Sequence, residues 1–259
     1  MKPIQRVKLP AALGDWRIWT HLGWRDLRAQ YARTWIGPWW TTATLGAVVL
    51  GTSMAVAFIG GEGIKEIVLR ITIGLSIWTF FATSLVDGAS IFETERSLLL
   101  NTTISELALV WRVVWRNLII FLHNLALVAL CLLAFSTDRF LALPWLLITI
   151  LVSLPFVALV TLVFGILALL RRDFRSLLPA VVQVGFFVTP VIWSPAPDGW
   201  GHVLTLINPI AWSIELARNV ILDGVYQWVW LLQMVIASAA CLLILSKVSH
   251  RMSFVRKRL

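Results

Sequence analysis

The sequence predicts an all-α integral membrane protein with six transmembrane helices, an amphipathic interfacial helix before them, and re-entrant helices on the outer side. Three observations lead to this fold class. Hydrophobic residues make up 59% of the chain and charged residues only 14%, whereas a soluble domain carries about 25% charged residues. Six apolar segments approach or exceed the roughly 20 residues that cross a bilayer. Broken apolar pieces near the C-terminal end are too short to span it.

The first element is expected to be an amphipathic helix in the headgroup layer of a membrane. Residues 24–40 read WRDLRAQYARTWIGPWW, and Gly37-Pro38 interrupts the helix before the first long apolar segment. Arg25 points away from the apolar face, and Arg28 lies at its edge. At helical spacing that face carries four large side chains: Trp24, Leu27, Tyr31 and Trp35. Such a helix beside a span is typical of a membrane surface. The alternative is a solvated helix whose aromatic stripe packs on another protein domain.

The predicted spans are residues 38–60, 66–90, 117–136, 143–170, 177–194 and 226–246. Of the 22 Lys and Arg residues, 18 fall in the termini and connections of one side and four on the other. This asymmetry places both termini in the cytoplasm, because cytoplasmic loops are enriched in Lys and Arg. The chain therefore divides into a cytoplasmic lead with the interfacial helix (1–37), a transmembrane domain (38–246) and a basic cytoplasmic tail (247–259).

The connection from about Glu93 to Arg116 is the longest cytoplasmic loop, and it is polar at its start. The triplet Asn101-Thr102-Thr103 interrupts it, and Ser105 with Glu106 can cap a second helix. A short exposed helix between spans is a suitable docking element for a cytoplasmic partner. An ordinary helical hairpin explains the same residues equally well, so both interpretations stay open.

The segment from about Ser194 to Val225 is expected on the outer side. Helix-interrupting residues divide it into short apolar pieces: Pro195, Pro197, Gly199, Gly201 and Pro209. Such pieces fit re-entrant helices buried in protein, because bare backbone is costly in lipid. The alternative is a folded extracellular cap, which has few charges to support it.

The sequence lacks the residue patterns of an enzyme. It has no Gly-x-x-x-x-Gly-Lys-Ser/Thr phosphate loop, its four His residues have no metal-ligand spacing, and Cys131 and Cys241 each lie in an apolar segment. Glu93 and Glu95 point to different faces of a helix, which argues against a catalytic carboxylate pair. We therefore expect no catalytic residue, no metal site and no cofactor bound by this chain. The net charge of +9 comes from short loops between apolar segments, so we expect no nucleic-acid partner.

Few polar residues lie inside the predicted spans. Asp87 lies near the cytoplasmic end of the second span. Hydration there lowers the free-energy cost of a charged side chain, so a structural or entrance role is favoured over a proton relay. His123-Asn124 in the third span is suited to hydrogen bonds between helices. A secondary transporter would need ionisable residues near mid-membrane and usually a repeat. A membrane enzyme acting on a polyprenyl lipid would need a charged cluster at one membrane face, and neither pattern is present.

The order of these motifs resembles the ABC-2 type exporter permeases. The pieces that carry the resemblance are Arg25-Asp26 with Tyr31, Gly37-Pro38, His123-Asn124, Arg172-Asp173, Thr189-Pro190 and Asn208-Pro209. More closely, the chain is similar to the membrane subunit of polysaccharide ABC exporters, which handle O-antigen, capsule or teichoic-acid chains. The family often has a Phe-Pro pair where this chain has Ile104-Ser105.

The resemblance implies a homodimer in the bacterial inner membrane that works with two copies of a separate ABC ATPase, which would hold ATP and Mg. Together they would move a lipid-linked glycan outward, in contact with membrane lipids. The cytoplasmic connection would be the coupling helix, with these coupling residues: Glu93, Glu95, Arg96, Asn101 and Ile104. Residues 195–225 would form outer gate helices, with these gate residues: Asn208, Pro209, Glu215 and Arg218. An ABC-2 type permease for small molecules, drugs or lipids is the alternative.

Aromatic residues offer a physical basis for a glycan path. Sugars present C–H faces that stack on aromatic rings, so an aromatic passage can hold a sugar chain weakly and let it slide. The candidates are Trp39, Trp40, Trp78, Phe80, Phe81 and Trp193. The alternative is the ordinary interfacial aromatic belt, which explains Trp39 and Trp40 better than it explains residues 78–81.

Overall fold

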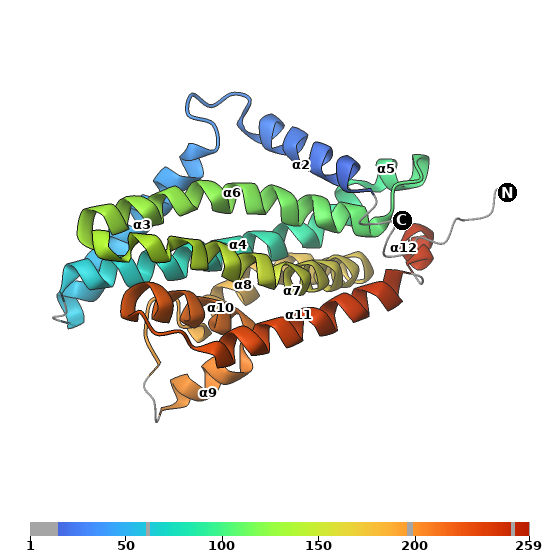
Figure 1. The fold of residues 1–259 in the computed structure, drawn as a ribbon. Helices are drawn as coiled ribbons and strands as arrows, with labels where there is room; N and C mark the ends of the chain where they lie inside the picture. Colours follow the sequence, from blue (N-terminus) through green and yellow to red (C-terminus); the bar gives the residue numbers. More distant parts are fainter. Residues whose placement is uncertain (1–14, 61–62, 196–198, 250–251, 259) are drawn as a thin grey trace.

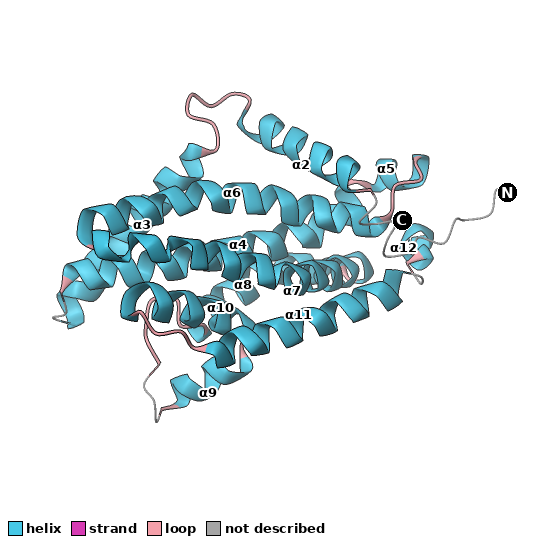
Figure 2. Cartoon of the chain, in the orientation of Figure 1, coloured by secondary structure: helices cyan, strands magenta, loops and turns pink. Residues whose placement is uncertain are grey.

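The computed structural model describes residues 15–60, 63–195, 199–249 and 252–258. Helices are the regular elements of these ranges (Figure 2), so the predicted all-α class is confirmed. In chain order they are α2 (Trp16–Tyr31), α3 (Trp39–Gly60), α4 (Ile64–Thr94), α5 (Arg96–Asn101), α6 (Glu106–Phe135), η1 (Thr137–Ala142), α7 (Leu143–Leu170), α8 (Arg172–Val188), α9 (Trp200–Ile207), α10 (Pro209–Arg218), η2 (Asn219–Asp223), α11 (Trp228–Ser249) and α12 (Ser253–Arg258). Outside the described residues lie 1–14 of the predicted lead, Pro197 of the outer segment, and 250, 251 and 259 of the tail.

Within the described ranges, five helices are long and apolar enough to cross a membrane: α3, α4, α6, α7 and α11. The sixth predicted span, residues 177–194, falls on α8, which has 17 residues and ends at Val188. At 1.5 Å per residue α8 is about 25 Å long, which is several Å less than a hydrocarbon core. The predicted count of six spans is therefore not confirmed. α8 nevertheless returns the chain from the end of α7 toward α10 (Figure 1).

Helix α4 is the centre of the bundle and packs against α3, α6, α7, α8 and α10. Its sequence from Ile67 to Phe81 is apolar on nearly every face, and its side chains there are almost all buried. Such a helix is stable only when neighbouring helices surround it. Gly88 lets α7 approach closely, because a Cβ at this position would lie within 3.0 Å of the Thr161 side chain. Small residues at helix contacts allow this kind of backbone approach in membranes.

Helix α6 begins at Glu106, well before the predicted start of the third span at residue 117. Ser105 caps it, because its Oγ accepts a hydrogen bond from the Ala108 amide N–H at 3.1 Å. The predicted cap is therefore present, but the helix that it starts is a long span rather than a short exposed one. We predicted that Arg112 and Arg116 lie in a loop because they are charged. Both instead lie in α6, where they pair with carboxylates of other elements.

Helix α2 ends at Tyr31, so Trp35 lies in the following loop, fully exposed. Leu27 is only 2% exposed, and a Cβ at Gly23 would lie 3.0–3.1 Å from atoms of α6. Trp24, by contrast, is 44% exposed. The four predicted residues therefore do not form one membrane-facing stripe. Part of the apolar face of α2 is covered by α6, above which α2 lies in Figure 1.

The bundle has two distinguishable ends (Figure 1). One end carries α5, α12 and the start of α2, and we call it the α5 end. At the opposite end α3 passes into α4, and α6 is followed by η1. The outer segment forms short helices, as the broken apolar pieces predict: α9 has 8 residues and α10 has 10. α10 packs against α4, α7 and α11, whereas α9 begins with the exposed Trp200.

We predict that the α5 end faces the cytoplasm, because 18 of the 22 Lys and Arg residues belong to that side of the predicted topology. Two single-cysteine variants test this orientation: Lys257→Cys at the α5 end and Asp138→Cys in η1, both with Cys131 and Cys241 changed to Ala. A membrane-impermeant maleimide should label Asp138→Cys in intact cells, and Lys257→Cys only after permeabilisation. The reverse labelling pattern would contradict the orientation.

Candidate functional site

Polar side chains at the α5 end connect the short elements to the bundle. Arg112 of α6 forms a bidentate pair with Asp26 of α2, in which Nε donates to Oδ2 at 2.5 Å and Nη2 donates to Oδ1 at 2.7 Å. Nη2 also donates to Oε1 of Glu95, between α4 and α5, at 3.0 Å. The Arg112 side chain is 6% exposed. One buried guanidinium group thereby joins α2, the α4–α5 junction and α6.

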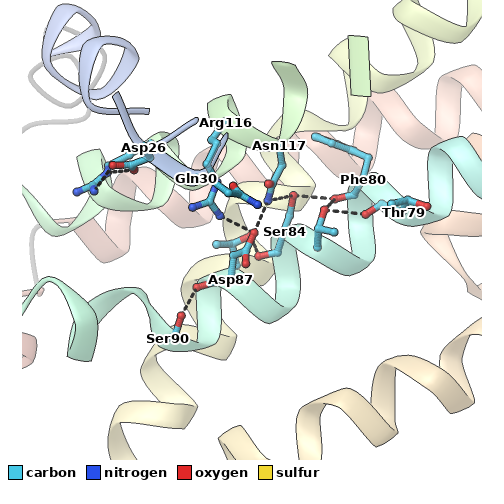
Figure 3. Close-up of polar contacts among 12 residues, drawn as sticks. Asp26, Gln30, Thr79, Phe80, Ser84, Asp87, Ser90, Arg116 and Asn117 are labelled. Carbon is cyan, nitrogen blue, oxygen red and sulfur yellow. Dashed lines mark hydrogen bonds and ion pairs between the residues drawn. The ribbon is translucent and has the colours of Figure 1, made fainter. Parts of the chain in front are cut away.

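A second polar group lies about one turn further along α6 (Figure 3). Arg116 Nη2 donates to Oδ2 of Asp87 at 2.5 Å, and Asn117 Nδ2 donates to the same oxygen at 3.1 Å. Asn117 Nδ2 also lies 3.3 Å from Ser84 Oγ. Figure 3 shows Ser84 and Asp87 on α4 pointing toward the α6 pair. Asp87 is therefore engaged in contacts that hold α4 to α6.

Tyr31, the last residue of α2, lies close to this second group. Burial of its hydroxyl raises the pKa of Tyr31 above the ordinary value of about 10. The hydroxyl is therefore protonated at neutral pH and can donate a hydrogen bond. Arg116 and Asp87 are close enough to act on the same pKa in opposite directions. Two residues in the C-terminal half of α2 thus approach charged groups that belong to the bundle.

Two of the predicted coupling residues are occupied by contacts within the chain. Glu95 accepts from Arg112, as described above. Glu93 Oε2 accepts from Arg175 Nη1 of α8 at 2.8 Å, in an ion pair that is about half exposed. These carboxylates fix the end of α4 to α6 and α8, and their predicted role in coupling stays a prediction.

The other predicted coupling residues lie in or beside α5. Arg96 and Asn101 are exposed at its two ends, and Leu100 between them is 49% exposed. Leu99 is fully buried and anchors the helix to the bundle. Ile104 lies half-buried in the turn before α6. α5 therefore attaches by one face and presents the other to solvent.

At the opposite end of α4, a polar group surrounds Arg218, the last residue of α10. Its side chain is 4% exposed, and Glu215 one turn earlier pairs with it at 3.3 Å. The guanidinium group donates to the main-chain carbonyl oxygens of Arg70, Pro190, Val191 and Trp193. Arg218 therefore connects α10 with α4 and with the segment that follows α8.

Asn208 and Pro209 start α10. The Asn208 side chain caps the helix, because its Oδ1 accepts from the Ile210 N–H at 3.0 Å. Its Nδ2 donates to Thr189 Oγ1 at 2.8 Å, and Pro209 occupies the first helical position, where its missing N–H costs nothing. The four predicted gate residues therefore belong to one structural group, which joins α10 to residues 189–193.

Gly74 of α4 makes the close approach of this group possible. A Cβ at this position would lie within 3.0 Å of both the Val191 carbonyl oxygen and the Arg218 guanidinium group. Because α4 has no side chain here, a charged group can reach backbone oxygens between the helices. A larger residue would separate α4 from α10.

The predicted path aromatics fall in two environments. Phe80 and Phe81 are each 2% exposed and Trp78 is 8% exposed. They pack on aromatic rings of neighbouring helices: Phe80 on Phe121, Phe81 on Phe156 and Trp78 on Phe186, with ring centroids 5.8–6.2 Å apart. Side chains buried in this way do not contact a glycan in this arrangement of the helices. Because α4 is surrounded on nearly all sides here, the predicted path role of these three residues stays a prediction that requires the helices to move.

The remaining candidates reach the surface. Trp39 and Trp40 are 50% and 60% exposed at the start of α3, and Trp193 is half-buried after α8. Trp39 also packs edge-on against His123 of α6, with centroids 5.1 Å apart. Asn124 accepts a hydrogen bond from Thr42 at 3.2 Å. Asn124 therefore makes the predicted hydrogen bond between helices, whereas His123 Nδ1 lies 2.7 Å from the Ile119 carbonyl oxygen of its own helix.

No protein-family model matches the chain. Among curated proteins, it is 25% identical over 198 residues to the O-antigen export system permease protein RfbA of Myxococcus xanthus. The alignment covers 75% of this chain and 72% of that protein. The chain resembles an O-antigen export permease. The resemblance to ABC-2 type polysaccharide exporter permeases is thus confirmed, and the five long apolar helices agree with a multi-pass membrane protein.

Sequence reasoning missed the partners of Arg112 and the role of Gly74. A signal for Arg112 was present, since Arg112 and Arg116 are four residues apart in LALVWRVVWRNLII and share one helical face. A polar pair on one face of an apolar helix indicates partners on a neighbouring helix. Gly74 had no comparable signal, because its importance depends on atoms from residues 191 and 218.

We predict that Asp26→Ala lowers the unfolding free energy by about 2 kcal/mol, because it removes two charge-assisted hydrogen bonds and leaves Arg112 with Glu95 alone. Arg25→Ala is the matched control, since Arg25 is exposed on the same helix. Thermal unfolding in lipid nanodiscs, followed by tryptophan fluorescence, measures the difference. Equal stability of the two variants would show that the Asp26 pair does not hold α2.

We predict that Gly74→Ala destabilises the protein by about 2–3 kcal/mol, because the added methyl group displaces Val191 or the Arg218 side chain. Gly51→Ala in α3 is the control, since a Cβ at Gly51 meets no atom within 4 Å, and it should change the stability by less than about 0.5 kcal/mol. The same unfolding measurement applies. If Gly74→Ala behaves like Gly51→Ala, the close packing around Arg218 is not required.

Proposed function

We propose that this chain is the transmembrane subunit of an ATP-driven exporter that moves lipid-linked polysaccharide outward across a bacterial inner membrane. The similarity to an O-antigen export permease over three quarters of the chain carries this proposal. In the proposed orientation the α5 end is cytoplasmic, which agrees with the distribution of Lys and Arg.

ATP hydrolysis is assigned to a separate subunit, because the sequence contains no phosphate loop. α5 is the proposed docking element for that subunit. Its exposed face offers Arg96, Leu100 and Asn101, while Leu99 and the Arg112–Glu95 pair attach it to the bundle. A push on α5 would therefore reach α6 and α2 directly through Arg112.

The glycan path is assigned to a surface shared by two copies of the chain. In the described part of one chain, two pockets lie beside α10 and α11, and each holds at most about one water molecule. Neither can hold a polysaccharide. α3 buries only four of its residues, and α8 buries only Leu178 among those whose side chains are described. These helices leave broad faces for a second copy or for lipid.

Aromatic residues on such a surface would hold a sugar chain by weak stacking contacts. The exposed Trp39 and Trp40 and the half-buried Trp193 fit this role. Trp78, Phe80 and Phe81 would reach a glycan only after α4 separates from its neighbours. The outer group of Asn208, Pro209, Glu215 and Arg218 would then act as the gate, because it holds α10 and the end of α8 together.

Co-purification with a candidate ABC ATPase, followed by ATPase assays in nanodiscs, tests the proposed function. Lipid-linked glycan should raise the hydrolysis rate above that seen with the lipid carrier alone. Stimulation by drugs or lipids, without any response to the glycan, would instead support an ABC-2 type permease for those substrates. Failure of every ABC ATPase of the source cell to bind the chain would refute the proposal.

We predict that Arg96→Trp and Asn101→Trp weaken ATPase binding by about tenfold or more, because each places a bulky ring on the proposed docking face of α5. Asp138→Trp in η1 is the control, since Asp138 is 80% exposed at the opposite end of the bundle. Affinity is measured by titrating the ATPase against nanodisc-embedded variants. Unchanged affinity in both α5 variants would exclude α5 as the docking helix.

A further inference from the structure

The C-terminal helix α12 is attached to the bundle. Val255 is fully buried and Met252 is 2% exposed, and both belong to the main hydrophobic core. α12 packs near α7 at the α5 end. By contrast, Lys257 and Arg258 on the same helix are exposed. The described part of the tail therefore contains basic residues in two different environments.

Arg256 uses its whole guanidinium group on the connection between α5 and α6. Nε donates to Oε1 of Glu106 at 2.8 Å. Nη1 donates to the Thr102 carbonyl oxygen at 3.0 Å, and Nη2 donates to the Ile104 carbonyl oxygen at 2.5 Å. Thr102 and Ile104 belong to the turn that ends α5, and Glu106 opens α6. One side chain thus spans the entire turn.

The charge balance of this contact explains why arginine stands at this position. The Glu106 side chain is 8% exposed, and a buried carboxylate without a partner is strongly unfavourable. The carbonyl oxygens of Thr102 and Ile104, both in the turn, accept the other two hydrogen bonds of Arg256. A planar fork of donors can reach a carboxylate and two carbonyls together, whereas an ammonium group acts as a single point charge.

We propose that Arg256 is a positioning residue that holds the α5–α6 turn, and with it α5, in the orientation needed to bind the ATPase. This inference rests on the proposed function, because α5 is the docking helix only within that proposal. The proposed role applies to Arg256 and not to Lys257 or Arg258, whose exposed charges would favour the cytoplasmic orientation of the tail. The structure supplies the matched controls, since all three residues carry the same charge on the same short helix.

The first experiment measures hydrogen exchange of the chain alone in nanodiscs. The Thr102 amide donates to Leu98, and the Ala108 amide donates to Ser105, so both report on the order of the turn. Arg256→Ala should raise their exchange rates on the order of tenfold or more, because it removes a charge-assisted contact to the turn. Lys257→Ala should leave them unchanged. Equal exchange in the two variants overturns the proposal, whatever the protein exports.

The second experiment measures affinity for the co-purifying ATPase. Arg256→Ala should bind it about tenfold more weakly than Lys257→Ala or Arg258→Ala, and Arg256→Lys should recover part of the loss. Arg256→Lys also serves if Arg256→Ala fails to fold, and it should still bind more weakly than the two controls. Affinity equal to that of the controls overturns the positioning role. If the wild-type chain binds no ATPase while the exchange effect is present, the proposed function fails and only the structural contact of Arg256 stands.

Discussion

The arrangement of the α5 end depends on the neutralisation of one buried guanidinium group. Removing a charge from water costs several kcal/mol even after relaxation of the protein, and Arg112 is almost completely buried. Asp26 and Glu95 offset that cost, and each belongs to a different element. If α2 or the α4–α5 junction left α6, the buried Arg112 would keep only one of its two carboxylate partners. This requirement makes α2 part of the bundle, although its sequence also suits a membrane surface.

The buried guanidinium group of Arg218 also needs partners, and most of them are main-chain oxygens rather than carboxylates. Four of its acceptors are main-chain carbonyl oxygens, three of them in the irregular segment after α8. Backbone groups outside regular helices need partners when water is excluded. The buried guanidinium group of Arg218 thus donates hydrogen bonds to carbonyl oxygens of the irregular segment. The absence of a side chain at Gly74 leaves room for this contact. The helix-interrupting residues of the outer segment and the charge of Arg218 are two parts of one arrangement.

Composition and apolar length were sufficient to predict the all-α membrane class and five of the six expected spans, because these properties depend on hydrophobicity. Composition and apolar length failed to predict the structure where a charged residue in a helix is paired with a residue of another element. Arg112 and Arg116 marked a loop by their charge, yet both lie inside α6 because Asp26 and Asp87 neutralise them. Helical spacing predicted one stripe on α2, but Leu27 is buried where α2 packs on α6, whereas Trp24 and Trp35 are exposed. The spacing of the two arginines indicates partners on a neighbouring helix, but local periodicity does not identify which distant residues these partners are.

The two arginine contacts at the α5 end act on opposite sides of α5. Arg112 binds Glu95 immediately before the helix, and Arg256 binds the turn immediately after it. A six-residue helix has little stability of its own, so without these contacts α5 could tilt or unwind under an applied force. Attached at both ends, it moves only together with α6 and α12. The proposed docking of an ATPase on α5 would require a helix that transmits force without bending, and the charge pairing outside α5 would provide that stiffness.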